Sequence, residues 1–386
     1  MTFPRVSVAT LLLFASTAGA QVRFTPLGDL PGGAFSSYAT GVSQDGLMVV
    51  GAGKRTNSFS EEEAILWTPA GGMVGLGDLA GGLPRSVAAA ISVDKRIVVG
   101  YSHGSRGTEA CYWDLNDGSL RGIGDLPGGD FNSLALACSA DGSSIVGVGT
   151  TQRGTRGFLW RASTGTMIDL GTLIQNAAAL ASDARAISAD GSVIVGSATA
   201  TSGGSQEAYM WTQQTGMVSL GRLPDAVNSF ASDMSVDGRY VTGSCDVFTQ
   251  DDGGAIMYRW SAASGMVPID SLSDDFESGT PQGISADGRV IVGTTIPQSD
   301  GQRCFIWREG EGIVGLETYL KSIGLDVRAM GYRISSISDI SDNGRFLVGT
   351  VTNPDGNGEA FLIEIPAPSA ASVLTIGALL PARRRR

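Results

Sequence analysis

The sequence predicts an all-β protein, a seven-bladed β-propeller with four-stranded blades. Three observations lead to this fold. One pattern recurs seven times between residues 27 and 365, every tryptophan of the chain falls at the same point of it, and the strand missing from the last copy stands before the first. The 55 glycines agree with many tight turns between short strands.

A Ser-x-Asp-Gly turn, followed by an apolar strand that ends in glycine, marks the pattern best. Two copies depart from it, Ser92-Val-Asp-Lys95 and Ser341-Asp-Asn-Gly344. Asp-Gly and Asn-Gly pairs tolerate the positive φ of a tight hairpin, so we expect the turn at Lys95 to be strained or different. We interpret the aspartates of the complete copies as structural, namely Asp45, Asp141, Asp190, Asp237 and Asp287.

Two further markers repeat in step with the turn. The closing glycines of the apolar strand are spaced by 49, 47, 49, 47, 50 and 56 residues: Gly51, Gly100, Gly147, Gly196, Gly243, Gly293 and Gly349. The tryptophans are Trp67, Trp113, Trp160, Trp211, Trp260 and Trp307. Ile363 takes their place in the seventh copy. Chance would not distribute every tryptophan in this way, so these positions belong to the structural repeat.

Each unit is expected to form four strands, which in the second unit span 87–92, 96–102, 109–114 and 120–126. The second strand is apolar at successive positions, as in Val290-Ile-Val292, so both of its faces should be buried. A sheet packed between two neighbouring sheets has this property, which is typical of propeller blades. A solenoid is the alternative, but helical content between the strands is lacking.

The N-terminal segment is predicted to close the ring. Residues 22–30 match the fourth strand of the later units through Leu27-Gly-Asp-Leu30, and the seventh unit ends after its third strand near Ile365. This strand would complete the last blade and so remove exposed sheet edges. The propeller then spans 21–365, with units near 31–79, 80–126, 127–173, 174–223, 224–272, 273–320 and 321–365.

Residues 1–20 have the layout of a secretory signal peptide. Arg5 supplies the positive region, 6–14 is apolar, and Ala18-Gly-Ala20 is a small-residue cleavage site. We therefore expect a signal peptidase to process the chain, and the mature protein to be secreted or displayed on the extracellular face of the cell envelope.

Residues 366–386 are interpreted as a C-terminal sorting or anchor signal. Pro366, Ala367 and Pro368 precede an apolar run over 370–382. Four arginines end the chain: Arg383, Arg384, Arg385 and Arg386. The 13-residue run is shorter than the roughly 20 residues of a spanning helix. Its order suits a segment that pauses in a membrane while its arginines stay on the cytoplasmic side.

This layout resembles the PEP-CTERM sorting signal of Gram-negative envelopes, although Ala367 stands where that family usually has glutamate. The resemblance implies processing by an exosortase-type enzyme, and it leaves cleavage and retention of the segment both open. A poorly ordered tail is the alternative interpretation.

The repeat itself resembles the HAF-type extracellular repeat. The carrying residues are Leu27-Gly-Asp-Leu-Pro-Gly-Gly33, its copy at 123–129 with Ile123 for leucine, the Ile-Ser-Ala-Asp-Gly and Val-Val-Gly strings, and Asn353-Pro-Asp-Gly356 in the last unit. The resemblance covers nearly the whole mature chain. It implies an extracellular location and a propeller-like architecture, and it implies no defined activity and no catalytic residues.

The charge argues against nucleic acid as a partner. The chain carries −11, and without the arginines of the two terminal segments the body has 22 basic and 38 acidic residues, or −16. Such a body repels phosphate backbones.

Few residues offer catalytic or metal chemistry. The only histidine, His103, is expected in a solvated loop, with a Ser-His-Asp arrangement as the alternative. The four cysteines lack a Cys-x-x-Cys pair, which argues against zinc: Cys111, Cys138, Cys245 and Cys304. Disulfides between adjacent blades and buried thiols are both compatible with the sequence.

Calcium binding is the alternative role for the aspartates of the repeated turns. Calcium takes about six to eight oxygen ligands, and each repeated turn offers one carboxylate. Asp251-Asp252 and Asp274-Asp275 are better candidates, with solvated loops as the alternative. No metal, no other cofactor and no catalytic residue is predicted.

The one long insertion, Lys321 to Arg333, is the first candidate for a binding site and is expected to hold a short helix. We expect a non-catalytic binding or structural protein whose partner is an extracellular polysaccharide or an envelope protein. The alternative is a hydrolase or lyase of extracellular glycans, which would need a non-repeated acidic cluster at one end of the channel.

Overall fold

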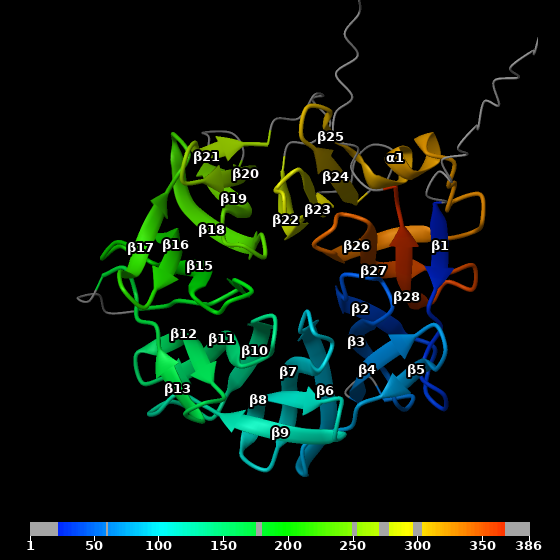
Figure 1. Cartoon of the computed structure of the whole chain (residues 1–386), viewed down its shortest axis with the longest axis horizontal. Coiled ribbons are helices and arrows are strands. Elements are labelled where there is room, and N and C mark those ends of the chain that lie inside the picture. Colours follow the sequence, from blue (N-terminus) through cyan, green and yellow to red (C-terminus); the bar gives the residue numbers. More distant parts are fainter. Residues whose placement is uncertain are drawn as a thin grey trace, which may run out of the picture.

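The computed structural model describes residues 22–58, 61–174, 180–248, 253–269, 278–295 and 303–366. Within these residues, 28 strands form seven four-stranded antiparallel sheets, arranged as blades around a central axis (Figure 1). The predicted seven-bladed β-propeller is therefore confirmed. The first strand of each blade lines the centre and the fourth forms the rim (Figure 1).

Blades 1 to 4 follow the chain in order. Blade 1 contains β2 (Ser37–Val42), β3 (Val49–Lys54), β4 (Glu62–Thr68) and β5 (Gly72–Gly75). Blade 2 contains β6 (Gly81–Ile91), β7 (Ile97–Gly104), β8 (Gly107–Asp114) and β9 (Ser119–Gly124). Blade 3 contains β10 (Ser133–Cys138), β11 (Ser144–Thr151), β12 (Gly154–Arg161) and β13 (Thr166–Asp169). Blade 4 contains β14 (Ala186–Ile187), β15 (Val193–Thr199), β16 (Gln206–Thr212) and β17 (Gly216–Gly221).

Blades 5 to 7 complete the ring. Blade 5 contains β18 (Ala226–Met234), β19 (Tyr240–Phe248), β20 (Gly253–Ser261) and β21 (Gly265–Pro268). Blade 6 contains β22 (Gly279–Ile284), β23 (Val290–Thr295), β24 (Cys304–Arg308) and β25 (Gly312–Gly315). The helix α1 (Leu316–Ser322) follows blade 6. Blade 7 contains β26 (Arg333–Ile340), β27 (Phe346–Thr352), β28 (Gly358–Glu364) and, from the other end of the chain, β1 (Arg23–Pro26).

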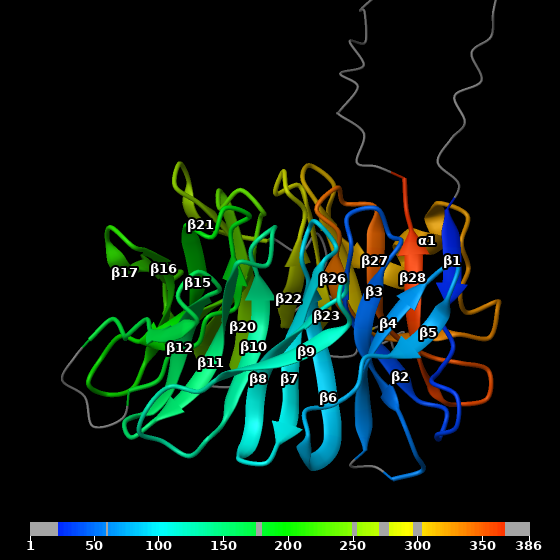
Figure 2. The same cartoon turned by 60° about the horizontal axis from the view of Figure 1, so that its bottom comes forward.

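The N-terminal strand closes the ring, as predicted. Antiparallel pairing between β1 and β28 runs from Arg23 opposite Glu364 to Pro26 opposite Phe361. The first and last described residues therefore leave the ring side by side, at the upper face in Figure 2. We call this face, which also carries the Ser-x-Asp-Gly turns, the turn face. The opposite end, where each fourth strand leads into the next blade, is the loop face.

The Ser-x-Asp-Gly turns are braced by their own side chains. In blade 1, Ser43 Oγ donates to Asp45 Oδ1 at 2.8 Å and accepts the Met48 N–H at 2.9 Å, while the Leu47 N–H donates to Asp45 Oδ1 at 3.1 Å. The serine-to-carboxylate bond recurs in every blade, with Asn343 in the role of aspartate in blade 7. The turn aspartates thus fix hairpins, which is a structural task.

Lys95 occupies the same turn at φ 61°, so the expected strain is present. Its backbone N–H donates to the Ser92 carbonyl at 2.9 Å, as the glycines of the other turns do. Its ammonium lies 2.6 Å from Asp45 Oδ2 in the preceding blade. The ion pair is half-exposed and offsets only part of the backbone cost.

The closing glycine of each second strand faces a backbone carbonyl of the first strand. A Cβ on Gly147 would lie 1.9 Å from Leu134 O, and the other six positions are equally crowded, at 1.9 to 2.3 Å. A β-bulge in the facing strand, between Ala135 and Ala137 in blade 3, disturbs the register at this level. Only glycine can therefore stand at this point of the repeat.

The repeated tryptophans lie on the third strands and pack between blades. Trp67 belongs to a core cluster with Val348 and Leu362 of blade 7, and Trp160 to one with Ile97 of blade 2. Trp113, Trp211, Trp260 and Trp307 stand at the matching places on β8, β16, β20 and β24. Ile363 has that place on β28 and packs in a cluster with residues of blade 6. The core is thus divided into layers, each shared by two neighbouring blades.

Candidate functional site

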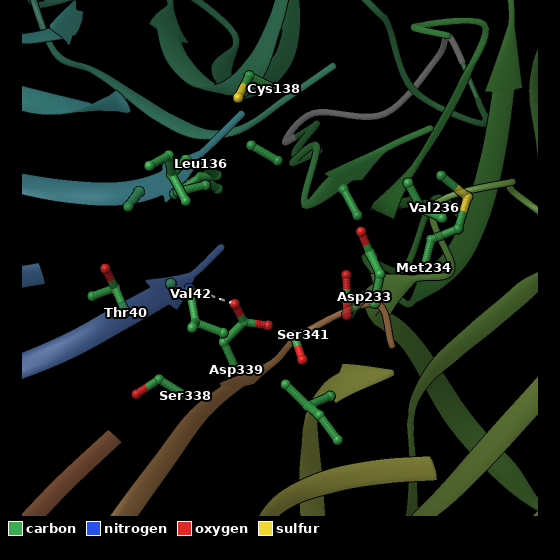
Figure 3. A pocket seen from close by; sticks show the side chains of 18 of the residues that line it. Thr40, Val42, Leu136, Cys138, Asp233, Met234, Val236, Ser338, Asp339 and Ser341 are labelled. Atoms are coloured by element: carbon green, nitrogen blue, oxygen red, sulfur yellow. Dashed lines mark hydrogen bonds between the residues drawn. The ribbon is translucent and has the colours of Figure 1, made fainter. Parts of the chain in front are cut away.

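The central channel is a cavity of about 270 Å³ that the first strands enclose. Its wall combines small and apolar residues such as Ala89 and Leu136 with uncharged polar ones such as Gln282 and Ser338. Three carboxylates interrupt this wall: Asp233 on β18, Asp339 on β26 and Asp342 in the following turn. Figure 3 shows Asp233 and Asp339 projecting into the cavity.

These acids are not part of the repeat. Asp233 and Asp339 each stand two residues before the turn serine. The other five blades have glycine or alanine in that place: Gly41, Ala90, Ala137, Ala186 and Gly283. This cluster was not predicted from the repeat pattern. An alignment of the seven copies at that position would have found it, because two charged residues stand out among five small ones.

Both carboxylates bridge blades. Asp339 Oδ2 accepts the Val42 N–H at 3.0 Å, which joins blade 7 to blade 1 (Figure 3). Asp233 Oδ2 accepts the Ile284 N–H at 3.0 Å, which joins blade 5 to blade 6. A bulge precedes each aspartate, between Ala231 and Asp233 in β18 and between Ile337 and Asp339 in β26. The channel acids therefore help to join neighbouring blades of the ring.

Their position in the channel raises the pKa values of these groups. Burial raises the pKa of Asp233 to about 7. Burial, followed by the nearby charge of Asp233, raises the pKa of Asp339 well above its ordinary value. Burial also raises the pKa of Asp342. Arg185 reaches the same cavity, but it forms an ion pair with Asp183 at 2.8 Å.

The raised pKa values of these carboxyls predict a contribution to folding stability that falls as the pH rises. A carboxyl with a pKa near 3.8 in the unfolded chain and about 7 in the fold keeps its proton in the native state between these values. The contribution of this carboxyl to stability is therefore fully present below about pH 4 and is lost as the pH rises to about 7. We expect the D233N/D339N variant, measured by urea unfolding, to flatten this slope and to gain on the order of 1 to 2 kcal/mol at pH 8, allowing for water in the channel. Equal slopes for both proteins would contradict this origin.

His103 was wrongly expected in a loop. It lies near the end of β7 and is half-buried, with its ring Nε2 at 3.4 Å from Thr108 Oγ1. Burial and then the charge of Arg85 lower its pKa. A neutral imidazole at neutral pH follows, and within the described residues its hydrogen-bond partner is a threonine rather than a Ser-Asp pair.

All four cysteines are free thiols, so neither cross-blade disulfide forms: Cys111, Cys138, Cys245 and Cys304. Burial raises the pKa of Cys138 and of Cys304 to about 12. Thiols of this kind are poor nucleophiles at neutral pH, and their role is packing.

The insertion of the seventh unit is built into the core. Its helix, α1, begins at Leu316 and overlaps only the first two residues of the predicted segment. Glu317 accepts the Ile334 N–H at 2.9 Å and pairs with Arg328, while Leu320 and Val327 lie in the core cluster of blades 6 and 7. The segment braces two blades rather than presenting a free loop.

The loop face is fixed by a repeated serine. In blade 3, Ser133 Oγ donates to Gly124 O at 2.6 Å and accepts the Ala110 N–H at 2.9 Å, so it ties two blades and the link between them. Apolar side chains stand two or three residues before this serine or its equivalents. They are Phe35 at 42%, Leu83 at 65% and Val227 at 43% exposure.

A related aromatic position lies under a cation. Phe131, two residues before Ser133, packs beneath Arg106, whose guanidinium carbon lies 4.0 Å from the ring centroid. The loop face thus combines exposed apolar side chains with one phenylalanine ring that lies under an arginine.

No family model matches the chain, and no curated protein matches it. Among solved structures, the chain is similar to the β-propeller domain of the Trilobed protease from Pyrococcus furiosus (12% identity, TM-score 0.56, 85% of this chain and 95% of that one). It is also similar to an oligogalacturonate lyase in complex with manganese (11%, TM-score 0.55, 90% and 98%). TolB from Acinetobacter baumannii matches at 12% and a TM-score of 0.44, with 86% of this chain spanning 64% of that one. At these identities the likeness shows the propeller fold alone.

Several sequence-based predictions lie outside the described residues. They are the signal peptide, the acid pairs at 251–252 and 274–275, and the sorting residues beyond Pro366. Among the described residues, none of the helices has the length and apolar character to cross a bilayer. The same residues contain no group of three or more histidine, cysteine, aspartate or glutamate side chains that could hold a metal ion.

Proposed function

We propose that this chain is an exported, non-catalytic propeller of the cell envelope or extracellular matrix that binds a polymer or a protein through its loop face. The observation that carries the proposal is the set of apolar side chains at the loop-face links, namely Phe35, Leu83 and Val227. Export rests on the signal-like residues 1–20 and on the sorting layout of 366–386.

Exposure of these side chains is unfavourable in the isolated protein, since apolar surface left in water forgoes about 25 cal/mol per Å² of burial. They stand two or three residues before a serine that fixes the backbone by two hydrogen bonds. Binding residues are often carried by loops that a rigid scaffold positions.

The placement of the acids supports a non-catalytic role. The turn aspartates brace hairpins, and Asp233 and Asp339 accept backbone N–H groups of neighbouring blades. A proton transfer at either channel carboxylate would compete with a bond that joins two blades.

The alternative, an enzyme acting on extracellular glycans, is favoured by one observation. Asp233 and Asp339 form the non-repeated acidic pair that such chemistry needs, and a carboxyl with a pKa of about 7 suits a general acid or base at neutral pH. Solved oligogalacturonate lyases share the propeller fold with this chain.

One set of variants separates the two functions. We expect F35S/L83S/V227S to weaken binding of the mature body to envelope or matrix polymers by about tenfold, measured by a glycan array followed by titration. V74S/I168S/V218S is the matched control, because these rim residues are 47%, 45% and 49% exposed. Binding unchanged by the first set, or sustained release of product from a polysaccharide that D233N abolishes, would overturn the proposal.

A further inference from the structure

A buried arginine replaces a repeated glutamate in blade 3. The residue four places before the tryptophan, or before Ile363 in blade 7, is glutamate in blades 1, 2, 4 and 7 and isoleucine in blade 5. It is arginine in blade 6, where Arg303 is exposed, and in blade 3, where Arg156 is buried. The glutamates of blades 1, 2 and 7 perform one task. Glu63, Glu109 and Glu359 each accept the N–H of a glycine at or just beyond the end of the fourth strand, at 3.0 Å. The exchange therefore reverses a charge at a fixed place of the fold.

The task of the missing glutamate is taken by Asp169. Its Oδ1 accepts the Gly171 N–H at 2.7 Å. In blades 1 and 2 the place of Asp169 is held by Gly75 and Gly122, where a Cβ would lie 2.3 Å from the glutamate. Blade 3 thus has Asp169 and Arg156 at the two places where blades 1 and 2 have a glycine and a glutamate. A guanidinium cannot accept a hydrogen bond, so Arg156 takes no part in binding the Gly171 N–H.

Arg156 is poorly compensated for a buried cation. The residue is 4% exposed. Its Nη1 donates to the carbonyls of Thr155, at 3.0 Å, and Leu180, and its Nε lies 3.8 Å from Asp169 Oδ2. Among the described residues, no acceptor faces Nη2. Burial lowers the pKa of Arg156, the carboxylate of Asp169 opposes this, and the charge of Arg153 adds to it. A buried charge in such surroundings favours a further anion.

A cavity of about 410 Å³ adjoins this guanidinium. Its polar lining consists of Thr151, Gln152, Arg153, Arg156, Asp169 and Thr172. The charged groups are two arginines and one aspartate, so the lining is net positive in a protein that is otherwise strongly acidic. The volume falls within the usual range for a small-molecule or sugar-unit site, roughly 300 to 1,000 Å³.

We propose that this cavity binds an oxyanion, a carboxylate or sulfate group carried by an acidic polysaccharide, with Arg156 and Arg153 as its charged ligands. The assignment of the ligand to a polysaccharide rests on the proposed function, whereas the oxyanion site rests on the geometry of blade 3. Asp169 lies on the same wall and weakens anion binding, which keeps the site reversible. The long-range repulsion from the acidic body makes the affinity sensitive to salt.

Charge variants that preserve the backbone test the site. Asparagine at position 169 still offers an oxygen to the Gly171 N–H, so D169N removes a competing charge without removing the bond. We expect D169N to tighten binding of sulfate and of galacturonate about fivefold and R153Q to weaken both about fivefold, by calorimetry on the mature body at low salt. R289Q removes the same charge from a half-exposed turn-face arginine and should leave both affinities unchanged.

Titrations with different ligands distinguish which molecule carries the oxyanion. Tri-galacturonate should bind more tightly than galacturonate and follow the same order of variants, while a neutral galactose trimer should not bind this cavity. Equal effects of R153Q and R289Q, or no gain from D169N, would overturn the oxyanion site. Response to sulfate without response to either uronate would overturn the polysaccharide assignment. The F35S/L83S/V227S variant leaves the sulfate titration unchanged, so failure of the proposed function is read separately.

Discussion

Gly147→Ala should lower the free energy of unfolding by about 3 kcal/mol or more, one of the largest single-residue effects in this protein. The new Cβ would lie 1.9 Å from Leu134 O of β10, and Gly147 belongs to β11, which pairs with β10 on one side and β12 on the other. Relief requires β10 and β11 to separate, which would break ladder bonds at the channel wall. Urea unfolding followed by tryptophan fluorescence measures the loss.

Gly165→Ala is the control for this substitution. Gly165 has a φ of 65° and no atom within 4 Å of the position of a Cβ, so only backbone strain of about 1 kcal/mol is expected. If both variants lost the same stability, crowding by the carbonyl would not be the reason for the repeated glycine.

Removing residues 22–30 should cost about 5 kcal/mol or more and lower the midpoint of thermal unfolding by about 10 °C. The deletion removes the ladder with β28, the bond from the Gly28 N–H to Glu359 at 3.0 Å, and the buried side chains of Leu27 and Leu30. It also exposes the edge of β28, so concentration-dependent aggregation should accompany the loss.

A chain that begins at residue 22 is the matched control, and it should unfold as the longer chain does. A synthetic peptide of residues 22–36 should restore the midpoint of the shortened chain, because an added strand can pair with the open edge. An unchanged midpoint after the deletion would show that blade 7 does not depend on β1.

The sequence allowed the number of blades, the strand order and the ring closure to be predicted, because each depends on a pattern repeated seven times. The reasons behind the pattern were less accessible. Gly147 was recognised from its spacing, but the carbonyl that requires it belongs to a bulge of another strand. His103 lies on β7, which continues two residues beyond the predicted end of that strand at residue 102.

The candidate sites were mostly missed for a related reason. A search for repeats gives weight to what recurs, whereas Asp233 and Asp339 matter because they differ from their counterparts in the other blades. Arg156 matters because it is buried, while the matching arginine of blade 6 is exposed. Their significance appears only when the third dimension brings them to a channel or a cavity. The insertion at 321–333 was predicted to be a binding site instead, because length alone does not distinguish a free loop from one packed into the core.

The register that places Arg23 opposite Glu364 also has a mechanical consequence. If the protein is held through the chain beyond Pro366, as proposed, a pull on a ligand at the loop face is transmitted along β28. That strand lies between β1 and β27, so the force acts in shear on two ladders at once. A tether at the N-terminal end also pulls along its strand, but β1 has only the ladder with β28. Two ladders therefore bear a load applied through the C-terminus, and one ladder bears a load applied through the N-terminus.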